Sequence, residues 1–481
     1  MKICFICEGS YPFVVGGVSS WIQMLLKEYE RQYEEIKFSV WTIATSEKEM
    51  NDYKYDIPSN VVDIKRIYLA DRAFVKKHRG MYRVKKGKEI LRALIMGDTD
   101  EVGWDSILNF LNQYKHELVD ILMSEEFFNL AVELYNSKYS RTVFSTFLWN
   151  LRSMFFPLVA VLSNEFAEAD IYHAVSTGYA GVLGGLASHV HKKPFVLTEH
   201  GIYTREREEE IIKSDWVNGA FKEMWIDFFK MLSHIAYQKA SRVITLFETN
   251  KSIQVELGCP AEKISIVPNG VDMERFKNLP ARSDASRQFV NIGVVARVVP
   301  IKDIKTMLLA FDIVKQKVPN ARLIILGPCD ENTEYYKECA ELLEELDIDD
   351  VYFKGNVNIL EYLPDFDMML LTSISEGQPL AVLEGMAAKI PQICTNVGSC
   401  KELLYGKRDD TIGRAGIIVP VMNIQKIADA MIELSTNSRL RLNMGEAGFL
   451  RVEKYYRKSV FLSKYYNLYK SMERGDMSWQ E

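Results

Sequence analysis

Short apolar runs alternate with segments of helical periodicity along most of the chain. A run such as Ile3–Cys7 or Phe195–Thr198 is apolar at nearly every position, which is typical of a strand buried on both faces of a parallel sheet. The regular alternation with helices predicts an α/β protein. Because the pattern restarts after a polar stretch at 276–287, we expect two Rossmann-like domains. The predicted strands are 3–7, 38–43, 61–69, 170–175, 195–198, 242–246, 263–267, 289–295, 322–326, 351–354, 368–372, 392–395 and 417–420.

The alternation is interrupted between Asp71 and Asn164, where segments such as Trp104–Met123 have helical periodicity. This interval predicts a helical insertion in the first domain. It begins with a basic run that has two interpretations: a solvated face, or a surface for membrane headgroups or the growing product. The basic residues are Lys76, Lys77, Arg79, Arg83, Lys85, Lys86, Lys88 and Arg92.

The composition is that of a globular protein, with 481 residues, 48% hydrophobic and 26% charged. This length exceeds one ordinary core and supports two domains. A formal net charge of -6 gives no reason to expect nucleic-acid binding. We see no N-terminal leader and no apolar segment long enough to span a bilayer, the longest being Met154–Leu162. We therefore expect a cytoplasmic protein, and leave open a peripheral position at the inner face of the cell membrane.

The chain has seven cysteines, which fit a reducing compartment. Cys4 and Cys7 have CxxC spacing, but they fall within a predicted strand, and no second pair completes a zinc site. We therefore interpret all seven as packing thiols.

The most informative stretch is Ser375–Gly385, which follows the predicted strand 368–372. It reads as a tight Glu-Gly turn and a helix with Pro379 at its first position. The first helical amides would hold an anion, with Glu376 beside it and Glu384 further along the helix. This layout suits a nucleotide sugar, in which a diphosphate lies between two sets of hydroxyls. Two surface glutamates on an ordinary helix are the alternative.

Other candidate residues follow other predicted strands. Arg297 and Lys302 follow 289–295 and form a cationic site that can stabilise a leaving diphosphate. His200 follows 195–198, where it contacts a sugar hydroxyl or is a capping residue at the edge of the core. Gly16-Gly17 precedes a helix expected to be capped by Ser19, and this pair is not a GxGxxG dinucleotide fingerprint.

Two further turns follow predicted strands. Gly355–Val357 offers backbone groups that could contact a base edge. Asn269–Asp272 contains an Asn-Gly turn signal, and we expect its role to be mostly structural.

Three Asp-x-Asp triplets have the spacing with which single-domain, metal-dependent transferases hold a divalent cation. They are Asp98–Asp100, Asp347–Asp349 and Asp365–Asp367. None directly follows an apolar strand, so we interpret them as solvent-facing or capping residues. Two fixed cations at Arg297 and Lys302 would make a metal unnecessary, and we expect no metal site.

The glutamate pair, Arg297 with Lys302, Gly16-Gly17-Val18 and Asn269–Asp272 resemble, in order, the pattern of retaining family 4 glycosyltransferases. Segments 7–21, 173–181 and 198–207 resemble the PelF family of Pel exopolysaccharide synthesis. This implies a GT-B fold, with two Rossmann-like domains facing each other across a cleft. The implied divisions are 1–275 for the acceptor domain with its insertion at about 71–164, 276–455 for the nucleotide-sugar domain, and 456–481 for a helix packing back on the first domain.

The resemblance also implies a retaining, metal-independent enzyme that uses a UDP-sugar, a polysaccharide acceptor and an inner-membrane export complex. The expected catalytic residues are His200, Glu376, Arg297 and Lys302. The alternatives are a non-catalytic nucleotide-sugar binder, a dehydrogenase and an inverting or phosphorylase-type enzyme. Glucose, N-acetylglucosamine and N-acetylgalactosamine are not distinguished. The expected donor-binding residues are Gly16, Gly17, Arg297, Lys302, Val357, Glu376, Gly377, Gln378, Pro379, Leu380 and Glu384.

Overall fold

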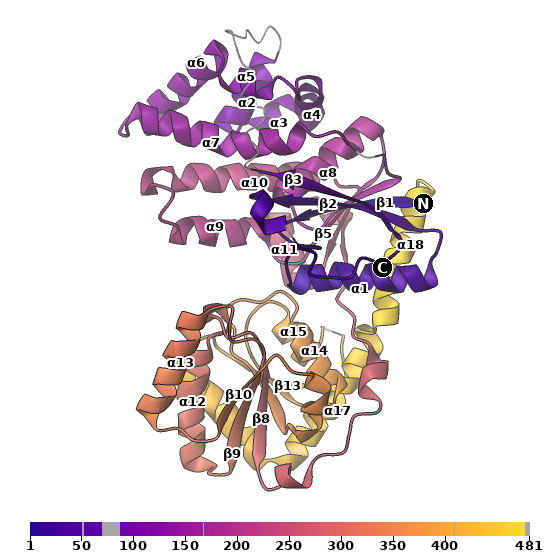
Figure 1. Ribbon diagram of the computed structural model, residues 1–481, viewed down its shortest axis with the longest axis vertical. Coiled ribbons are helices and arrows are strands. Elements are labelled where there is room, and N and C mark those ends of the chain that lie inside the picture. The colour runs from indigo at the N-terminus through magenta and orange to yellow at the C-terminus, as the bar shows by residue number, and fades with distance from the viewer. Residues whose placement is uncertain (51, 70–86, 167, 408, 477–481) are drawn as a thin grey trace. The chain divides into compact units, whose positions relative to one another are not determined.

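The computed structural model describes all residues except 51, 70–86, 167, 408 and 477–481 (Figure 1). The chain forms two compact units. Unit 1 contains Met1–Thr245, Asn250–Ile266 and Tyr466–Glu481. Unit 2 contains Leu246–Thr249 and Val267–Tyr465, so the chain enters it before the polar stretch at 276–287.

Unit 1 is built on a parallel sheet of seven strands in the order β3-β2-β1-β4-β5-β6-β7. Ile3 of β1 pairs with Phe38 on one side and Ile171 on the other, so the strand order reverses between β1 and β4. Every residue from Ile3 to Cys7 is buried, which explains the continuous apolar run. The strands are β1 Lys2–Glu8, β2 Lys37–Ala44, β3 Val61–Tyr68, β4 Ile171–Ala174, β5 Phe195–Glu199, β6 Arg242–Thr245 and β7 Ile264–Ile266.

Unit 2 has a parallel sheet of six strands in the order β10-β9-β8-β11-β12-β13. Along β11, Met368 and Leu370 pack in one hydrophobic core while Met369 and Leu371 pack in another. Because successive side chains of a strand point to opposite faces, the sheet is covered on both sides. The strands are β8 Val290–Val295, β9 Ala321–Leu326, β10 Val351–Gly355, β11 Met368–Leu371, β12 Gln392–Thr395 and β13 Gly416–Val419.

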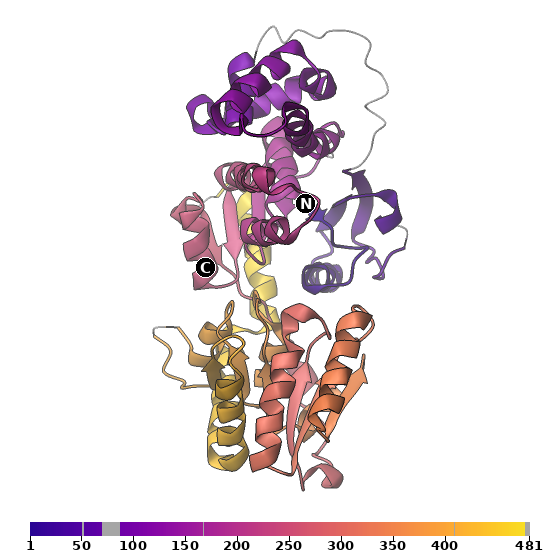
Figure 2. The same cartoon turned by 90° about the vertical axis from the view of Figure 1, so that its left-hand side faces the viewer.

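The helical insertion forms a cluster of its own beside the unit 1 sheet (Figure 1 and Figure 2). Its described helices are α2 Lys88–Met96, α3 Thr99–Val102, α4 Trp104–Gln113, α5 Leu118–Leu122, α6 Glu125–Leu134 and α7 Phe144–Leu162. Six residues of the basic run, from Lys76 to Lys86, lie outside the described residues. Lys88 and Arg92 are on α2, and Arg92 pairs with Glu133 at 2.6 Å.

Helix α7 corrects one expectation from the sequence. By length and composition it is apolar enough to cross a membrane, whereas no such segment was predicted. Half of its most apolar window is buried inside unit 1, and a core helix satisfies the same criterion. The polar residues Asn150, Arg152 and Ser153 interrupt its apolar sequence, which is why the prediction stopped at Met154–Leu162.

The remaining helices connect the strands. In unit 1, α8 packs on α10, and in unit 2, α12 packs on α16 and α14 on α17. In the C-terminal helix α18, Tyr466 stacks on Tyr33 with 4.1 Å between ring centroids. The bounds are α1 Gly17–Gln32, α8 Gly178–His191, α9 Tyr203–Lys213, α10 Lys222–Lys239, α11 Glu248–Glu256, α12 Ile304–Lys317, α13 Thr333–Leu346, α14 Leu380–Ala387, α15 Cys400–Tyr405, α16 Ile424–Thr436, α17 Ser438–Tyr455 and α18 Lys458–Glu473.

Two predicted helix starts are wrong by one or more residues. Helix α1 begins at Gly17 after an extended Gly16, so Ser19 lies inside the helix instead of capping it. Pro379 is the N-cap of α14, with an extended backbone, and the first helical residue is Leu380. Burial raises the pKa of Cys4 to about 12, as expected for a packing thiol.

Candidate active site

Parallel sheets bind ligands beyond the carboxyl ends of their strands, at the point where the strand order reverses. In unit 2 that point lies between the adjacent strands β8 and β11. Arg297 and Lys302 follow β8, and Glu376 follows β11. The predicted cations and the first predicted glutamate therefore lie at the same edge of one sheet.

Lys302 and Glu376 form a close ion pair between Nζ and Oε1. Ser373 Oγ donates a second hydrogen bond to the same carboxylate oxygen at 2.6 Å. The backbone of Lys302 is fixed by Thr372, whose hydroxyl donates to the Lys302 carbonyl at 2.8 Å. The lysine and glutamate side chains are 17% and 12% exposed. Both charged groups are thus held in place before any ligand binds.

Arg297 has a different ion-pair partner at the same edge of the sheet. Its Nη1 contacts Glu331 Oε2 at 2.6 Å, and both side chains are about half exposed, at 52% and 41%. Exposed pairs of this kind contribute about 0–1 kcal/mol. Arg297 can therefore exchange Glu331 for a phosphate at little cost in free energy.

The Glu-Gly turn depends on a glycine that sequence reasoning did not single out. Gly398 has a φ of +49°, and a Cβ there would lie 2.2 Å from the Gly377 carbonyl oxygen and 2.3 Å from that of Glu376. The Ser399 amide donates to the Gly377 carbonyl at 2.9 Å. The loop after β12 therefore supports the turn through its backbone, and the glycine next to the strand end signals this in the sequence.

Glu384 lies on α14, with its side chain 20% exposed. Arg275 Nη1 donates to Glu384 Oε1 at 3.3 Å. Burial raises the pKa of Glu384, and Arg275 opposes this shift. Arg275 was not among the predicted site residues, because nothing in its local sequence connects it with α14.

The predicted cradle of amides from Gln378 to Leu380 needs a correction, because Pro379 has no amide hydrogen. The Gln378 side chain is buried, and its Oε1 accepts the Asn269 amide at 2.6 Å. Asn269–Asp272 is thus tied to the candidate site, and Asp272 pairs with Lys458 at 2.6 Å. Val357 follows the edge strand β10 and packs on the core that contains β11.

The other predicted site residues belong to unit 1. His200 follows β5, and its ring packs edge-on against Trp21 with 4.8 Å between centroids. Burial lowers the pKa of His200 to about 4, so the ring is neutral at pH 7. Its Nε2 is a buried atom without a hydrogen-bond partner among the described residues. Gly16 and Gly17 are exposed at the start of α1, where the Gly16 amide donates to Tyr55 at 3.4 Å.

Residues of the three Asp-x-Asp triplets lie at helix ends or in a buried ion pair. Asp98 is the N-cap of α3 and Asp347 the C-cap of α13. Asp367 corrects the expectation of solvent exposure, because it is 7% exposed and pairs with Arg282 at 2.8 Å. In the described part of the chain, no group of three or more His, Cys, Asp or Glu side chains could hold a metal ion.

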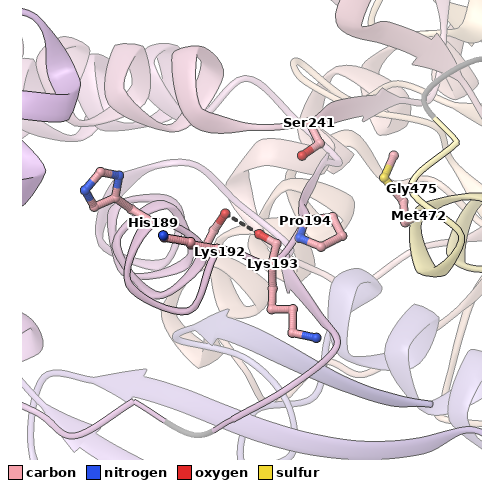
Figure 3. Close-up of a pocket in the computed structure, with 8 residues that line it drawn as sticks. His189, Lys192, Lys193, Pro194, Ser241, Met472 and Gly475 are labelled. Atoms are coloured by element: carbon pink, nitrogen blue, oxygen red, sulfur yellow. Dashed lines mark hydrogen bonds between the residues drawn. The ribbon is translucent and has the colours of Figure 1, made fainter.

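A separate hollow of about 460 Å³ lies where α8 ends and β5 begins (Figure 3). Lys193 contributes its carbonyl to a 2.6 Å hydrogen bond from Ser188, and its ammonium contacts Asp170 at 3.6 Å. This hollow is at the amino end of β5, the opposite end of the strand from His200. We therefore do not assign the reaction to it.

Comparison with protein families covers both halves of the chain. Residues 1–262 match the model of a domain of unknown function, DUF3492. Residues 278–451 match the model of the glycosyl transferases group 1.

Two characterised relatives show how far the similarity extends. N-acetyl-alpha-D-glucosaminyl L-malate synthase of Bacillus anthracis is 27% identical over 248 residues, which are 51% of this chain and 61% of that protein. The N,N'-diacetylbacillosaminyl-diphospho-undecaprenol alpha-1,3-N-acetylgalactosaminyltransferase of Campylobacter jejuni is 23% identical over 382 residues, 76% of this chain and 93% of that protein. The match thus spans about three fifths of the first relative and nearly all of the second.

Solved structures share the fold along 98% of the chain. Anabaena HepE in complex with UDP and glucose has a TM-score of 0.59 at 14% identity, covering 98% of this chain and 100% of that one. Sucrose-phosphate synthase of Thermosynechococcus elongatus has a TM-score of 0.62 at 14% identity, covering 98% and 99%. Identities this low establish the architecture and not the substrates.

Proposed function

We propose that the chain moves a hexosyl or N-acetylhexosaminyl unit from a UDP-sugar to a growing exopolysaccharide. Residues 278–451 match the model of the glycosyl transferases group 1, and the chain has two Rossmann-like domains of the GT-B type. The observation that carries this proposal is the fixed Lys302–Glu376 pair at the reversal point of the unit 2 sheet. A cation there suits a diphosphate, and a carboxylate there suits sugar hydroxyls. The complex of HepE with UDP and glucose supports the choice of donor class.

We propose transfer with retention of configuration. The acceptor hydroxyl attacks the anomeric carbon on the face from which UDP leaves. The bond from that carbon to the phosphate oxygen breaks as the bond to the acceptor oxygen forms. The departing phosphate takes the acceptor's proton, and Lys302 and Arg297 stabilise its developing charge. These two cations supply the charge that a divalent metal would bring, so the reaction proceeds without one.

The other residues position the substrates. Glu376 accepts hydrogen bonds from the hexose hydroxyls and Glu384 from the ribose hydroxyls. In unit 2, the amides of Gln378 and Leu380 contact the phosphates and the turn at Val357 contacts the base. In unit 1, the backbone at Gly16 and Gly17 can approach a phosphate closely. His200 is neutral at pH 7 because burial lowers its pKa to about 4. It therefore acts as a hydrogen-bond partner of a sugar hydroxyl and not as a cationic acid.

The cellular setting is part of the same proposal. The resemblance of segments 7–21 and 198–207 to the PelF family supports a cytoplasmic enzyme of Pel-type synthesis that works with an inner-membrane export complex. An acceptor linked to a lipid diphosphate is the second possibility, because the Campylobacter jejuni relative is named for such an acceptor.

A donor panel tests the proposal. UDP-glucose, UDP-N-acetylglucosamine and UDP-N-acetylgalactosamine are each incubated with oligosaccharide acceptors, with and without a chelator. We expect UDP release that depends on acceptor and survives chelation, and an α-linkage from an α-linked donor by NMR. UDP binding without product from any donor would instead favour a non-catalytic nucleotide-sugar binder.

A further inference from the structure

Two segments that are far apart in the sequence meet at the carboxyl edge of the unit 1 sheet. Glu8 ends β1, and Tyr203 and Arg207 lie on α9, which follows β5. The Tyr203 hydroxyl donates to Glu8 Oε1 at 2.8 Å, and Arg207 Nη2 lies 3.6 Å from the same oxygen. None of the three has a role in the donor chemistry of unit 2.

The other oxygen of Glu8 accepts the first amides of α8. Tyr179 donates to Oε2 at 3.0 Å and Ala180 donates at 3.3 Å. The Glu8 side chain is 9% exposed, so the carboxylate is held firmly at the start of this helix. Helix N-termini attract anions, and here the protein's own carboxylate fills that position. A phosphate is therefore excluded from the N-terminus of α8, which would otherwise be the best phosphate site at this edge.

Arg207 is fixed but not covered. Its guanidinium lies over the Tyr203 ring at 5.1 Å and the Phe229 ring at 5.9 Å, and Nη1 contacts Glu210 at 2.5 Å. The side chain is nevertheless 34% exposed. A planar guanidinium has five hydrogen-bond donors, and those that face solvent can bind hydroxyl or carbonyl oxygens without any change of rotamer.

The same edge contains buried polar atoms that lack partners within the described residues. Ser176 Oγ, after β4, and His200 Nε2, after β5, have no hydrogen-bond partner there. The strands β1, β4 and β5 are neighbours in the sheet, and the order reverses between β1 and β4. Unpaired buried polar atoms are rare in folded proteins, and each calls for an explanation. A bound ligand rich in hydroxyl groups would supply hydrogen-bond partners for both atoms and so explain them.

The charge of α9 also opposes an anionic ligand, because its carboxylates outnumber its cations. The helix contains Arg205, Glu206, Arg207, Glu208, Glu209, Glu210 and Lys213.

Resting on the proposed transfer reaction, we propose that this edge binds the acceptor as an uncharged saccharide, with Arg207 and Glu8 as its specificity-determining residues and Ser176 and His200 as further hydrogen-bonding partners. Arg207 donates to the hydroxyl and ring oxygens of the acceptor sugar. Glu8 holds Arg207 and Tyr203 in position and keeps phosphate away from α8. The enzyme therefore extends a neutral glycan end and discriminates against a phosphorylated one.

Direct binding tests this assignment independently of turnover. Short uncharged oligosaccharides of N-acetylhexosamine, and the same molecules phosphorylated on the terminal sugar, are titrated against the full chain by NMR, and UDP is titrated by calorimetry. In Arg207→Ala we expect the uncharged saccharide to bind about 10- to 100-fold more weakly, the range for lost hydrogen bonds to a charged group. UDP affinity should change less than about twofold, because Arg207 has no role in the donor chemistry of unit 2.

Matched variants separate recognition from folding. Arg205→Ala removes an exposed arginine from the same helix and should leave saccharide affinity unchanged. Arg207→Lys keeps the charge but not the forked donors, so it should remain folded and still bind saccharide more weakly. Glu8→Gln should reduce the preference for uncharged over phosphorylated ligand.

The outcomes distinguish this inference from the proposed reaction. Wild-type saccharide affinity in Arg207→Ala, or tighter binding of the phosphorylated oligosaccharide by wild type, would overturn the assignment even if transfer is observed. Saccharide binding that depends on Arg207, in a protein that never releases UDP, would overturn the reaction and support the saccharide site.

Discussion

The two candidate edges use charge in opposite ways. In unit 2, Arg297 and Glu331 pair while about half exposed, at 52% and 41%. In unit 1, Glu8 is 9% exposed and accepts two helix amides and a phenol. Exposed pairs open at a cost of about 0–1 kcal/mol, whereas breaking a buried pair costs about 3–5 kcal/mol. Arg297 therefore lets the unit 2 edge exchange an internal partner for a charged ligand beside the fixed Lys302–Glu376 pair, whereas Glu8 suits the unit 1 edge to presenting a fixed surface to a neutral ligand.

The largest expected effect comes from removing the fixed cation of unit 2. Lys302→Ala should lower kcat by about 10²–10³-fold, the range for losing one group that stabilises transition-state charge. UDP release under saturating donor measures it. Lys305→Ala is the control, because Lys305 lies on the following helix and pairs with Glu338 outside the Glu-Gly turn. Full turnover in Lys302→Ala would remove the leaving-group role from this lysine.

The backbone support of the Glu-Gly turn should give the next largest effect. Gly398→Ala places a Cβ about 2.2 Å from the Gly377 carbonyl oxygen, so the turn must move. We expect about 1–3 kcal/mol of lost stability and a weaker affinity for UDP. Gly413→Ala is the control, because Gly413 also has a positive φ of +103° but no atom lies within 4 Å of the added Cβ. Equal UDP affinity in the two variants would show that the contact does not shape the site.

The sequence predicts the parts of these edges that depend on a single strand. The thirteen strands of the described residues were expected within a few residues, because strands such as β1 are continuous buried runs. Arg297, Lys302 and Glu376 were predicted because each follows such a strand. Arg275, Gly398 and the Glu8–Arg207 contact were missed, because each depends on a partner more than twenty residues away in the sequence.

Glu384, the proposed partner of the ribose hydroxyls, should give a smaller effect. Glu384→Gln removes a negative charge on α14 and should weaken UDP binding about tenfold, equivalent to about 1.4 kcal/mol, with little change in kcat. Arg275→Ala should have a smaller effect in the same direction, since Arg275 acts only through its 3.3 Å contact with Glu384. Calorimetry with UDP measures both. A larger loss in Arg275→Ala than in Glu384→Gln would mean that Arg275 itself contacts the nucleotide.

The smallest effect concerns the neutral histidine of unit 1. Burial lowers the pKa of His200 to about 4, below its ordinary value near 6.5. Between these values the unfolded chain binds a proton that the folded chain does not, so this residue makes stability fall as the pH decreases from 6.5 to 4. One histidine contributes at most about 1.4 kcal/mol per pH unit to that slope.

Urea unfolding of wild type and His200→Gln at several pH values from 4.5 to 7.5 isolates this contribution. The stability difference between the two proteins should change in favour of His200→Gln as the pH falls, and should be constant above pH 7. Burial raises the pKa of Glu8 and of Glu199, which gives both proteins a slope of the opposite sign. Because these carboxylates are present in both, their contribution cancels in the difference. A difference that does not vary with pH would mean that folding does not lower the pKa of His200, and the ring would then be cationic at this edge below a pH of about 6.5.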